Sequence, residues 1–101
     1  RADARKGDGM SSNQETTAEI LKVIGNHSVV KLPSRQFPSI TLKGDTFHVL
    51  ISTIRYAIDR FDTDAEEAIS TLESLSEELK SVLSEYEQAL VQHGFELPYR
   101  K

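Results

Sequence analysis

The spacing of hydrophobic residues changes once along this chain, at Gly44-Asp45. Over residues 16–42, apolar residues come in short runs that we interpret as strands with a period of two, and several of them are β-branched. After Asp45, apolar residues recur every three or four positions. A period of two is typical of half-buried strands, and a period near 3.6 of helices with one buried face. The pattern predicts strands at about 17–24, 28–32 and 39–43, followed by helices at about 46–61 and 64–93.

Turn residues separate the predicted strands. Gly25-Asn26 lies between the first two runs and tolerates a positive φ, which favours a hairpin. Pro33 and Pro38 enclose the next connection, and since proline lacks an N–H, this stretch is predicted to be a loop. An isolated hairpin is marginal in water, so a third strand and a helical cover are expected. The predicted fold class is α+β, a small three-stranded antiparallel sheet followed by a two-helix antiparallel hairpin.

The first predicted helix has one apolar stripe, formed by Phe47, Leu50, Ile51, Ile54, Ile58 and Phe61. Asp45 is placed to cap its start. The second helix is expected to begin at a capping box made of Thr63 and Glu66. Asp62 and Asp64 favour its positively polarised N-terminal end.

The second predicted helix carries the longest pattern in the chain. Its apolar stripe consists of Ala65, Ala68, Leu72, Leu75, Leu79, Val82, Tyr86, Ala89 and His93, widened by Ile69, Leu83 and Leu90. Gly94 is the expected left-handed stop. At 1.5 Å per residue the helix is roughly 45 Å long against about 24 Å for the first, so it overhangs. Either the sheet or a second chain covers the overhang, and we favour the sheet. Phe95, Leu97 and Tyr99 are expected to fold back.

Length and composition indicate one small domain. The chain has 101 residues, of which 38% are hydrophobic, and residues 15–101 are expected to form a single α+β domain. Residues 1–14 contain only Ala2, Ala4 and Met10 as apolar side chains, so we expect a disordered leader, or a vector remnant ahead of Met10. The absence of cysteine fits a reducing, cytoplasmic location. No apolar run is long enough to span a bilayer, and no membrane partner is expected.

Charge is distributed unevenly along the chain. Residues 20–56 carry a net charge of +4, whereas residues 57–101 carry −7. The segment Asp59–Glu87 holds ten acids opposed only by Arg60 and Lys80. Such a field repels phosphate backbones, which disfavours direct binding of nucleic acid, and it attracts basic protein partners. Alternatively, these acids only keep the exposed side of a long helix solvated, and in that case they bind no partner.

The sequence offers no recognisable catalytic constellation. His27, His48 and His93 lack the spacing of metal ligands on one helix. A partial calcium-loop pattern beginning at Asp62 fails because Glu67 occupies the position that requires glycine. Neither a glycine-rich phosphate loop nor a nucleophile elbow occurs. We therefore expect no enzyme activity, no metal and no cofactor.

Two features are candidate partner-binding sites. The first is the acidic segment, represented by Asp62, Asp64, Glu66, Glu67, Glu73 and Glu77. The second is the loop between Pro33 and Pro38, in which Arg35 and Phe37 would serve as secondary anchors. A proline-braced loop loses little entropy on binding, and arginine and aromatic residues are favoured interface anchors. Alternatively, Phe37 packs into the core and Arg35 pairs with a helix acid.

The same loop carries a resemblance. The stretch Val29-Val30-Lys31-Leu32-Pro33-Ser34-Arg35-Gln36-Phe37-Pro38, with Gly44-Asp45 before a helix and the ending Gly94-Phe95-Glu96-Leu97-Pro98-Tyr99, resembles a small bacterial family of unknown function over about residues 16–99. That family has a Leu-Pro-x-Arg-x-Phe-Pro motif, often with glycine where this chain has Ser34 and Ser39. The resemblance implies no activity.

In type, the chain is similar to bacterial immunity proteins, which are small, acidic and free of cysteine. This similarity implies an immunity protein that covers the basic substrate site of a toxin domain, most plausibly a nuclease. Because Ala65, Ala68 and Ala89 are small for a free-standing coiled coil, we expect a monomer when no partner is present. The alternative is a non-catalytic structural or regulatory adaptor that acts through its exposed helix. A dimer would favour the adaptor.

Overall fold

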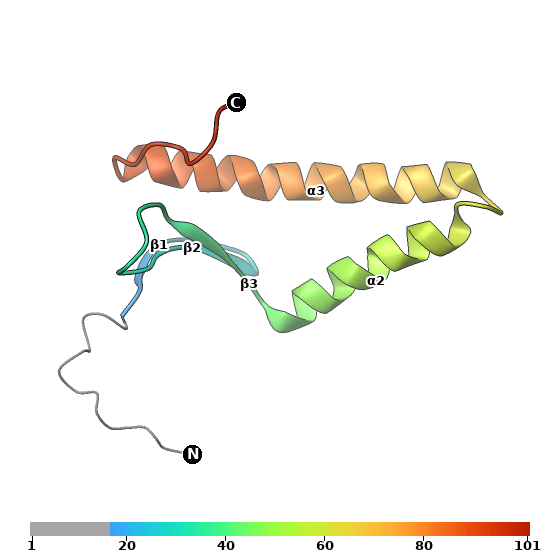
Figure 1. Cartoon of the computed structure of the whole chain (residues 1–101), viewed down its shortest axis with the longest axis horizontal. Coiled ribbons are helices and arrows are strands. Elements are labelled where there is room, and N and C mark those ends of the chain that lie inside the picture. Colours follow the sequence, from blue (N-terminus) through green and yellow to red (C-terminus); the bar gives the residue numbers. More distant parts are fainter. Residues whose placement is uncertain (1–16) are drawn as a thin grey trace, which may run out of the picture.

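A computed structural model describes residues 17–101 and shows a three-stranded antiparallel sheet followed by two helices (Figure 1). The strands are β1 (Glu19–Ile24), β2 (His27–Lys31) and β3 (Ser39–Leu42), and the helices are α2 (Gly44–Arg60) and α3 (Ala65–Gln92). The α+β class and all five predicted elements are confirmed, with bounds shifted by one or two residues. The expected leader at 1–14 lies outside the described residues.

The sheet follows chain order, β1-β2-β3. Gly25 makes the β1–β2 turn with φ of +54°, a conformation that glycine adopts without steric cost. In β2, Val29 pairs with Ile40 of β3, and Val30 pairs with Ile20 of β1. The β1–β2 register shifts between Ile20 and Lys22, which is a β-bulge.

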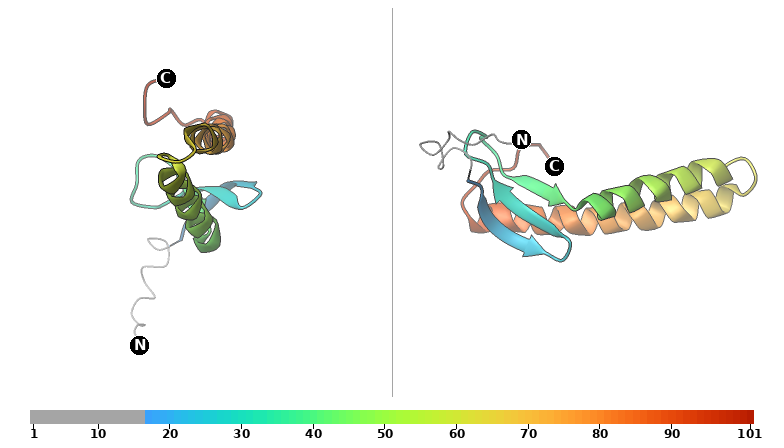
Figure 2. Two further views of the ribbon diagram at one scale, coloured as in Figure 1. Left: turned by 90° about the vertical axis from the view of Figure 1, so that its right-hand side faces the viewer. Right: turned by 90° about the horizontal axis from the view of Figure 1, so that it is seen from below.

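The core lies between the sheet and the C-terminal half of α3, where the two are packed together (Figure 2). Its buried residues are Val29 of β2 and Tyr86, Ala89 and Leu90 of α3, with Leu21, Ile24, Phe95 and Leu97 packed around them. At its edge, Lys22 forms a 2.6 Å ion pair with Glu85. The sheet therefore covers the C-terminal half of α3, as expected.

The end of α3 is a Schellman motif. Gly94 has φ of +80°, its N–H donates to the Val91 carbonyl, and the Phe95 N–H donates to the Leu90 carbonyl. This geometry turns the chain back along the helix, so that Phe95 and Leu97 pack against the core. The predicted left-handed stop and the folded-back tail are both present.

Both predicted helix starts need correction. Helix α2 begins at Gly44 with Lys43 as an N-cap that makes no side-chain bond, and Asp45 lies in the first turn, where its carboxylate accepts from the Thr46 N–H. Helix α3 is capped by Asp64, whose side chain accepts from the Glu67 N–H at 3.1 Å. The Thr63 hydroxyl donates instead to the Arg60 carbonyl. The Thr63–Glu66 capping box is therefore wrong by one residue.

The two helices form an antiparallel hairpin that extends beyond the sheet (Figures 1 and 2). Along this extension the predicted burial of the apolar stripes is present only in part: Ala68 is buried and Leu50 and Leu75 are half-buried, but most of the large apolar residues are exposed. Ala57 is the one buried residue of α2, and Ala68 is the one buried residue in the part of α3 before Tyr86. Leu79, which the periodicity places in the core, is 42% exposed.

Candidate functional site

The hairpin presents a continuous apolar surface. We define the apolar face as the exposed large side chains that share one side of the hairpin: Phe47, Ile51, Ile54 and Ile58 of α2, Phe61 directly after it, and Ile69, Leu72, Leu79 and Leu83 of α3. Ile58 is 51% exposed and Phe61 is 55% exposed. A groove of about 430 Å³ runs between Ile54 and the α3 leucines, and a second of about 400 Å³ lies beside Ile58 and Phe61.

Small residues explain why this face remains open. Thr53 and Ala57 of α2 lie toward α3, where Thr53 borders Thr71 and Leu75. In a helix of 3.6 residues per turn, the large α2 residues then point roughly 90° away from the partner helix. The hairpin therefore closes on alanine and threonine and leaves its largest hydrophobic side chains in solvent.

Three of the predicted acidic residues form a row on α3. Glu66, Glu73 and Glu77 are exposed and are spaced by seven and four residues, which places them on one side of the helix. We call these three residues the carboxylate row. It lies roughly 100° around α3 from the apolar face. Glu77 also pairs with Lys80 at 3.6 Å.

The other three acids have local partners or lie outside the row. Asp64 caps α3, and Glu67 accepts a 3.1 Å hydrogen bond from the Tyr56 hydroxyl of α2. Asp62 is exposed in the turn between the helices and borders the Phe61 groove. Of the six predicted acids, Asp64 and Glu67 therefore bond within the hairpin, and the other four face solvent.

The Arg35–Phe37 loop lies at the opposite end of the molecule. Its Pro38 is buried, and the Pro38 carbonyl accepts a 2.7 Å hydrogen bond from the Tyr86 hydroxyl. Arg35 is exposed, and Phe37 is half-buried. Because Tyr86 is 20 residues along α3 from Glu66, about 30 Å separates the loop from the start of the row. The two predicted binding features do not form one compact site.

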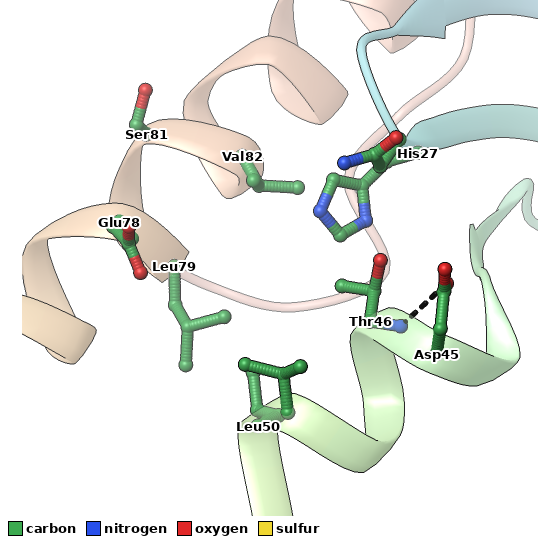
Figure 3. A pocket seen from close by; sticks show the side chains of 10 residues that line it. His27, Asp45, Thr46, Leu50, Glu78, Leu79, Ser81 and Val82 are labelled. Atoms are coloured by element: carbon green, nitrogen blue, oxygen red, sulfur yellow. Dashed lines mark hydrogen bonds between the residues drawn. The ribbon is translucent and has the colours of Figure 1, made fainter. Parts of the chain in front are cut away.

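A cavity of about 550 Å³ opens where α2 diverges from α3, beside the β1–β2 turn (Figure 3). Its polar lining includes His27, Asp45, Thr46 and Glu78, which the sequence analysis did not group. His27 Nδ1 lies 3.3 Å from the Thr41 carbonyl oxygen, and Asp45 accepts from the Thr46 N–H at 2.7 Å. The imidazole and the Asp45 carboxylate each face a backbone group rather than one another. Sequence spacing gave no signal, because these residues come from three separate elements.

The groups with displaced pKa values are Tyr99 of the C-terminal tail and Tyr86 and Glu87 of α3. Burial and a 2.7 Å hydrogen bond to Glu87 raise the pKa of Tyr99 to about 12, and the same bond lowers the pKa of Glu87. Burial also raises the pKa of Tyr86. These three residues fix the tail and the core, so their pKa shifts mark structural contacts.

Residues 17–101 contain neither a metal-binding cluster nor a helix able to span a membrane. In that range, no group of three or more His, Cys, Asp or Glu side chains is arranged to hold a metal ion. None of the helices described there combines the length and hydropathy needed to cross a membrane.

Comparison with known families adds one result to this geometry. A family model described as "Family of unknown function (DUF6959)" matches residues 13–99, nearly the whole chain. The chain belongs to this family. No curated protein and no solved structure shows a significant match. Membership in DUF6959 agrees with the expected family of unknown function, while the Leu-Pro-x-Arg-x-Phe-Pro motif and the likeness to immunity proteins stay predictions. The function of this DUF6959 chain must therefore be argued from its own surfaces.

Proposed function

We propose that this DUF6959 chain is an immunity protein that binds a basic toxin domain, most plausibly a nuclease, and covers its substrate site. The observation that carries the proposal is the carboxylate row, three solvent-facing acids on one side of α3. Helix α3 as a whole holds seven glutamates against one lysine. A nuclease cleft must be positive to hold phosphates, so a rigid negative helix matches it in charge.

We expect the carboxylate row, rather than all six predicted acids, to contact such a toxin. Glu66, Glu73 and Glu77 are held on a regular helix, so they would be presented without ordering a loop on binding. Asp64 and Glu67 are engaged within the hairpin. The loop that holds Arg35 and Phe37 contacts α3 at Tyr86, which is about 14 Å along the helix from Glu77 and about 30 Å from Glu66, so these two residues would contact only a partner that spans this distance.

Co-expression tests this proposal. A toxin-like domain encoded beside this chain would be produced with and without it, and immunity predicts rescue of growth and a complex that survives gel filtration at about 0.15 M salt. If neither rescue nor a complex is seen, the proposal is wrong.

Matched charge reversals locate the interface. Glu66→Lys combined with Glu73→Lys changes the net charge as much as Glu19→Lys combined with Glu96→Lys, and all four side chains are exposed. We expect the first pair to weaken toxin binding by about tenfold or more and to reduce its salt dependence, and the second to have little effect. Equal effects of the two pairs would show that only net charge matters and would exclude the row as the interface.

The apolar face favours the second candidate function, a non-catalytic structural or regulatory adaptor. Exposed contiguous apolar patches on soluble proteins commonly mark interaction sites. An adaptor acting through this face would bind its partner with weak salt dependence, because most of the contact would be apolar and only Lys80 and Asp62 line its grooves. Salt dependence therefore distinguishes the two functions.

A further inference from the structure

We propose that the apolar face binds the same face of a second copy of this chain, forming a four-helix arrangement around a twofold axis. The apolar face and the carboxylate row lie on different sides of α3, so this interface would leave the row accessible, and a dimer in solution would favour the adaptor over the toxin-binding proposal. It replaces the expectation of a monomer that was drawn from the sequence.

The first argument is the size of the face. Multiplying the exposed fractions by ordinary side-chain areas gives on the order of 600–700 Å² of apolar surface per chain. Two copies would bury on the order of 1,200–1,400 Å² from these side chains alone, which reaches the size of stable protein interfaces.

The second argument is the pattern on α3. Ile69, Leu72, Ser76, Leu79 and Leu83 are spaced by three and four residues in alternation, which is the seam of a coiled coil. The neighbouring seam of α3, which contains Ala68 and Leu75, is already used within the hairpin. A helix with two adjacent seams is suited to a bundle of more than two helices, and one hairpin supplies only two.

The third argument is charge. A twofold interface places a patch against itself, so a strongly charged patch would repel its copy. The apolar face consists of uncharged side chains, and two of the ions bordering it are paired locally, Arg55 with Asp59 and Lys80, which lines the central groove, with Glu77. Asp62 borders the second groove at the turn between the helices, away from the centre of the face. The carboxylate row would remain outside such an interface, which avoids opposing the two acidic surfaces.

Other occupants fit less well. Residues 1–16 contain only Ala2, Ala4 and Met10 as apolar side chains, too few to cover nine large hydrophobic residues. A basic partner attracted by the acids of α3 would meet them on another side of the helix. A second copy supplies an equal apolar area with no net charge.

The mass of the full chain in solution tests the proposal. Light scattering and sedimentation equilibrium should give twice 11.3 kDa for the wild type at high concentration, with reversible dissociation on dilution. A mass of 11.3 kDa over ~1 to ~100 μM would overturn the inference and leave the face to a different protein. A larger assembly would also contradict it, because a twofold interface closes at two copies.

Lysine substitutions then locate the interface. Leu72→Lys should raise the dimer dissociation constant about 30-fold or more, as loss of a buried anchor does. Val91→Lys is the matched control, because Val91 is 72% exposed on the same helix and lies outside the apolar face. If Leu72→Lys lowers helicity in circular dichroism, Ile58→Lys replaces it, since Ile58 is half-exposed on the other helix. If the dimer persists in whichever of Leu72→Lys and Ile58→Lys is correctly folded, the interface lies outside the apolar face. Dissociation of the dimer by Val91→Lys would lead to the same conclusion.

Discussion

The hydroxyl of Tyr86 donates a 2.7 Å hydrogen bond to the carbonyl oxygen of Pro38, 48 residues earlier in the chain. This bond joins α3 to the loop between β2 and β3. Both residues are buried, so neither group has water as a ready alternative partner. The contact therefore fixes the proline-braced loop to the core.

Tyr86→Phe should lower the free energy of unfolding by about 1–3 kcal/mol, because the buried Pro38 carbonyl loses its donor. Urea denaturation followed by circular dichroism measures this loss. Tyr56→Phe is the control, since its hydroxyl bonds to Glu67 at an exposed site, and its effect should stay within about 0.5 kcal/mol. Similar losses for both variants would mean that the Tyr86 bond has no special weight in the core.

The cap of α3 gives a second prediction. Asp64→Ala should destabilise the protein by about 0.5–2 kcal/mol, because the Glu67 N–H loses its side-chain acceptor. Thr63→Ala should change stability by no more than about 0.5 kcal/mol, since the Thr63 hydroxyl makes an exposed 3.4 Å contact with the Arg60 carbonyl. The melting temperatures of the two variants, each compared with that of the wild type, measure these effects. A larger loss for Thr63→Ala than for Asp64→Ala would show that Thr63 is the cap.

The error at this cap shows one limit of sequence analysis. Thr63 and Asp64 are adjacent and both are good caps, and each has a glutamate three residues later, Glu66 or Glu67. Local patterns cannot choose between these two registers, because the choice depends on how the turn packs. The switch of hydrophobic period at Gly44 and the stop at Gly94 were predictable because each is encoded within a few residues.

The apolar face shows a different limit. Periodicity reveals that Leu72, Leu79 and Ile58 lie on apolar stripes, but it does not reveal what covers a stripe. The threonine and alanine positions that turn these residues outward are visible in the sequence, yet their meaning depends on the helix pairing. The Tyr86–Pro38 bond and the cavity beside His27 depend on contacts between distant segments, for which a single sequence carries no signal.

The tail predicts a dependence of stability on pH. The pKa of Tyr99 is raised to about 12, chiefly by burial and then by Glu87, above the ordinary value of 10.0. Its contribution to stability is present below pH 10 and is lost as the pH rises toward 12, because the unfolded chain ionises first. The pKa of Glu87 is lowered, so its contribution is present above the ordinary value of 4.5 and is lost as the pH falls through the lower folded value.

Tyr99→Phe should remove most of the loss of stability at alkaline pH that comes from Tyr99 and most of the loss at acidic pH that comes from Glu87. The measurement is urea denaturation at neutral, acidic and alkaline pH, taken as the difference between wild type and variant. That difference should be largest near neutral pH and shrink in both directions. A difference that stays constant from acid to alkali would show that the Tyr99–Glu87 bond is absent in solution.

The last prediction compares two leucines of α3 that periodicity treats alike. Leu90 is fully buried in the core beside Val29, whereas Leu79 is 42% exposed on the apolar face. Leu90→Ala should cost about 2–5 kcal/mol at any protein concentration, because it leaves a cavity within one chain. Leu79→Ala should cost less in the separated chain, and the gap between its melting temperature and that of the wild type should widen at concentrations where the wild type is dimeric, since association stabilises the folded state by mass action. Calorimetry over a range of concentrations measures both effects. A large loss at Leu79 that does not change on dilution would mean that this leucine is covered within its own chain, and the apolar face would then be part of the core.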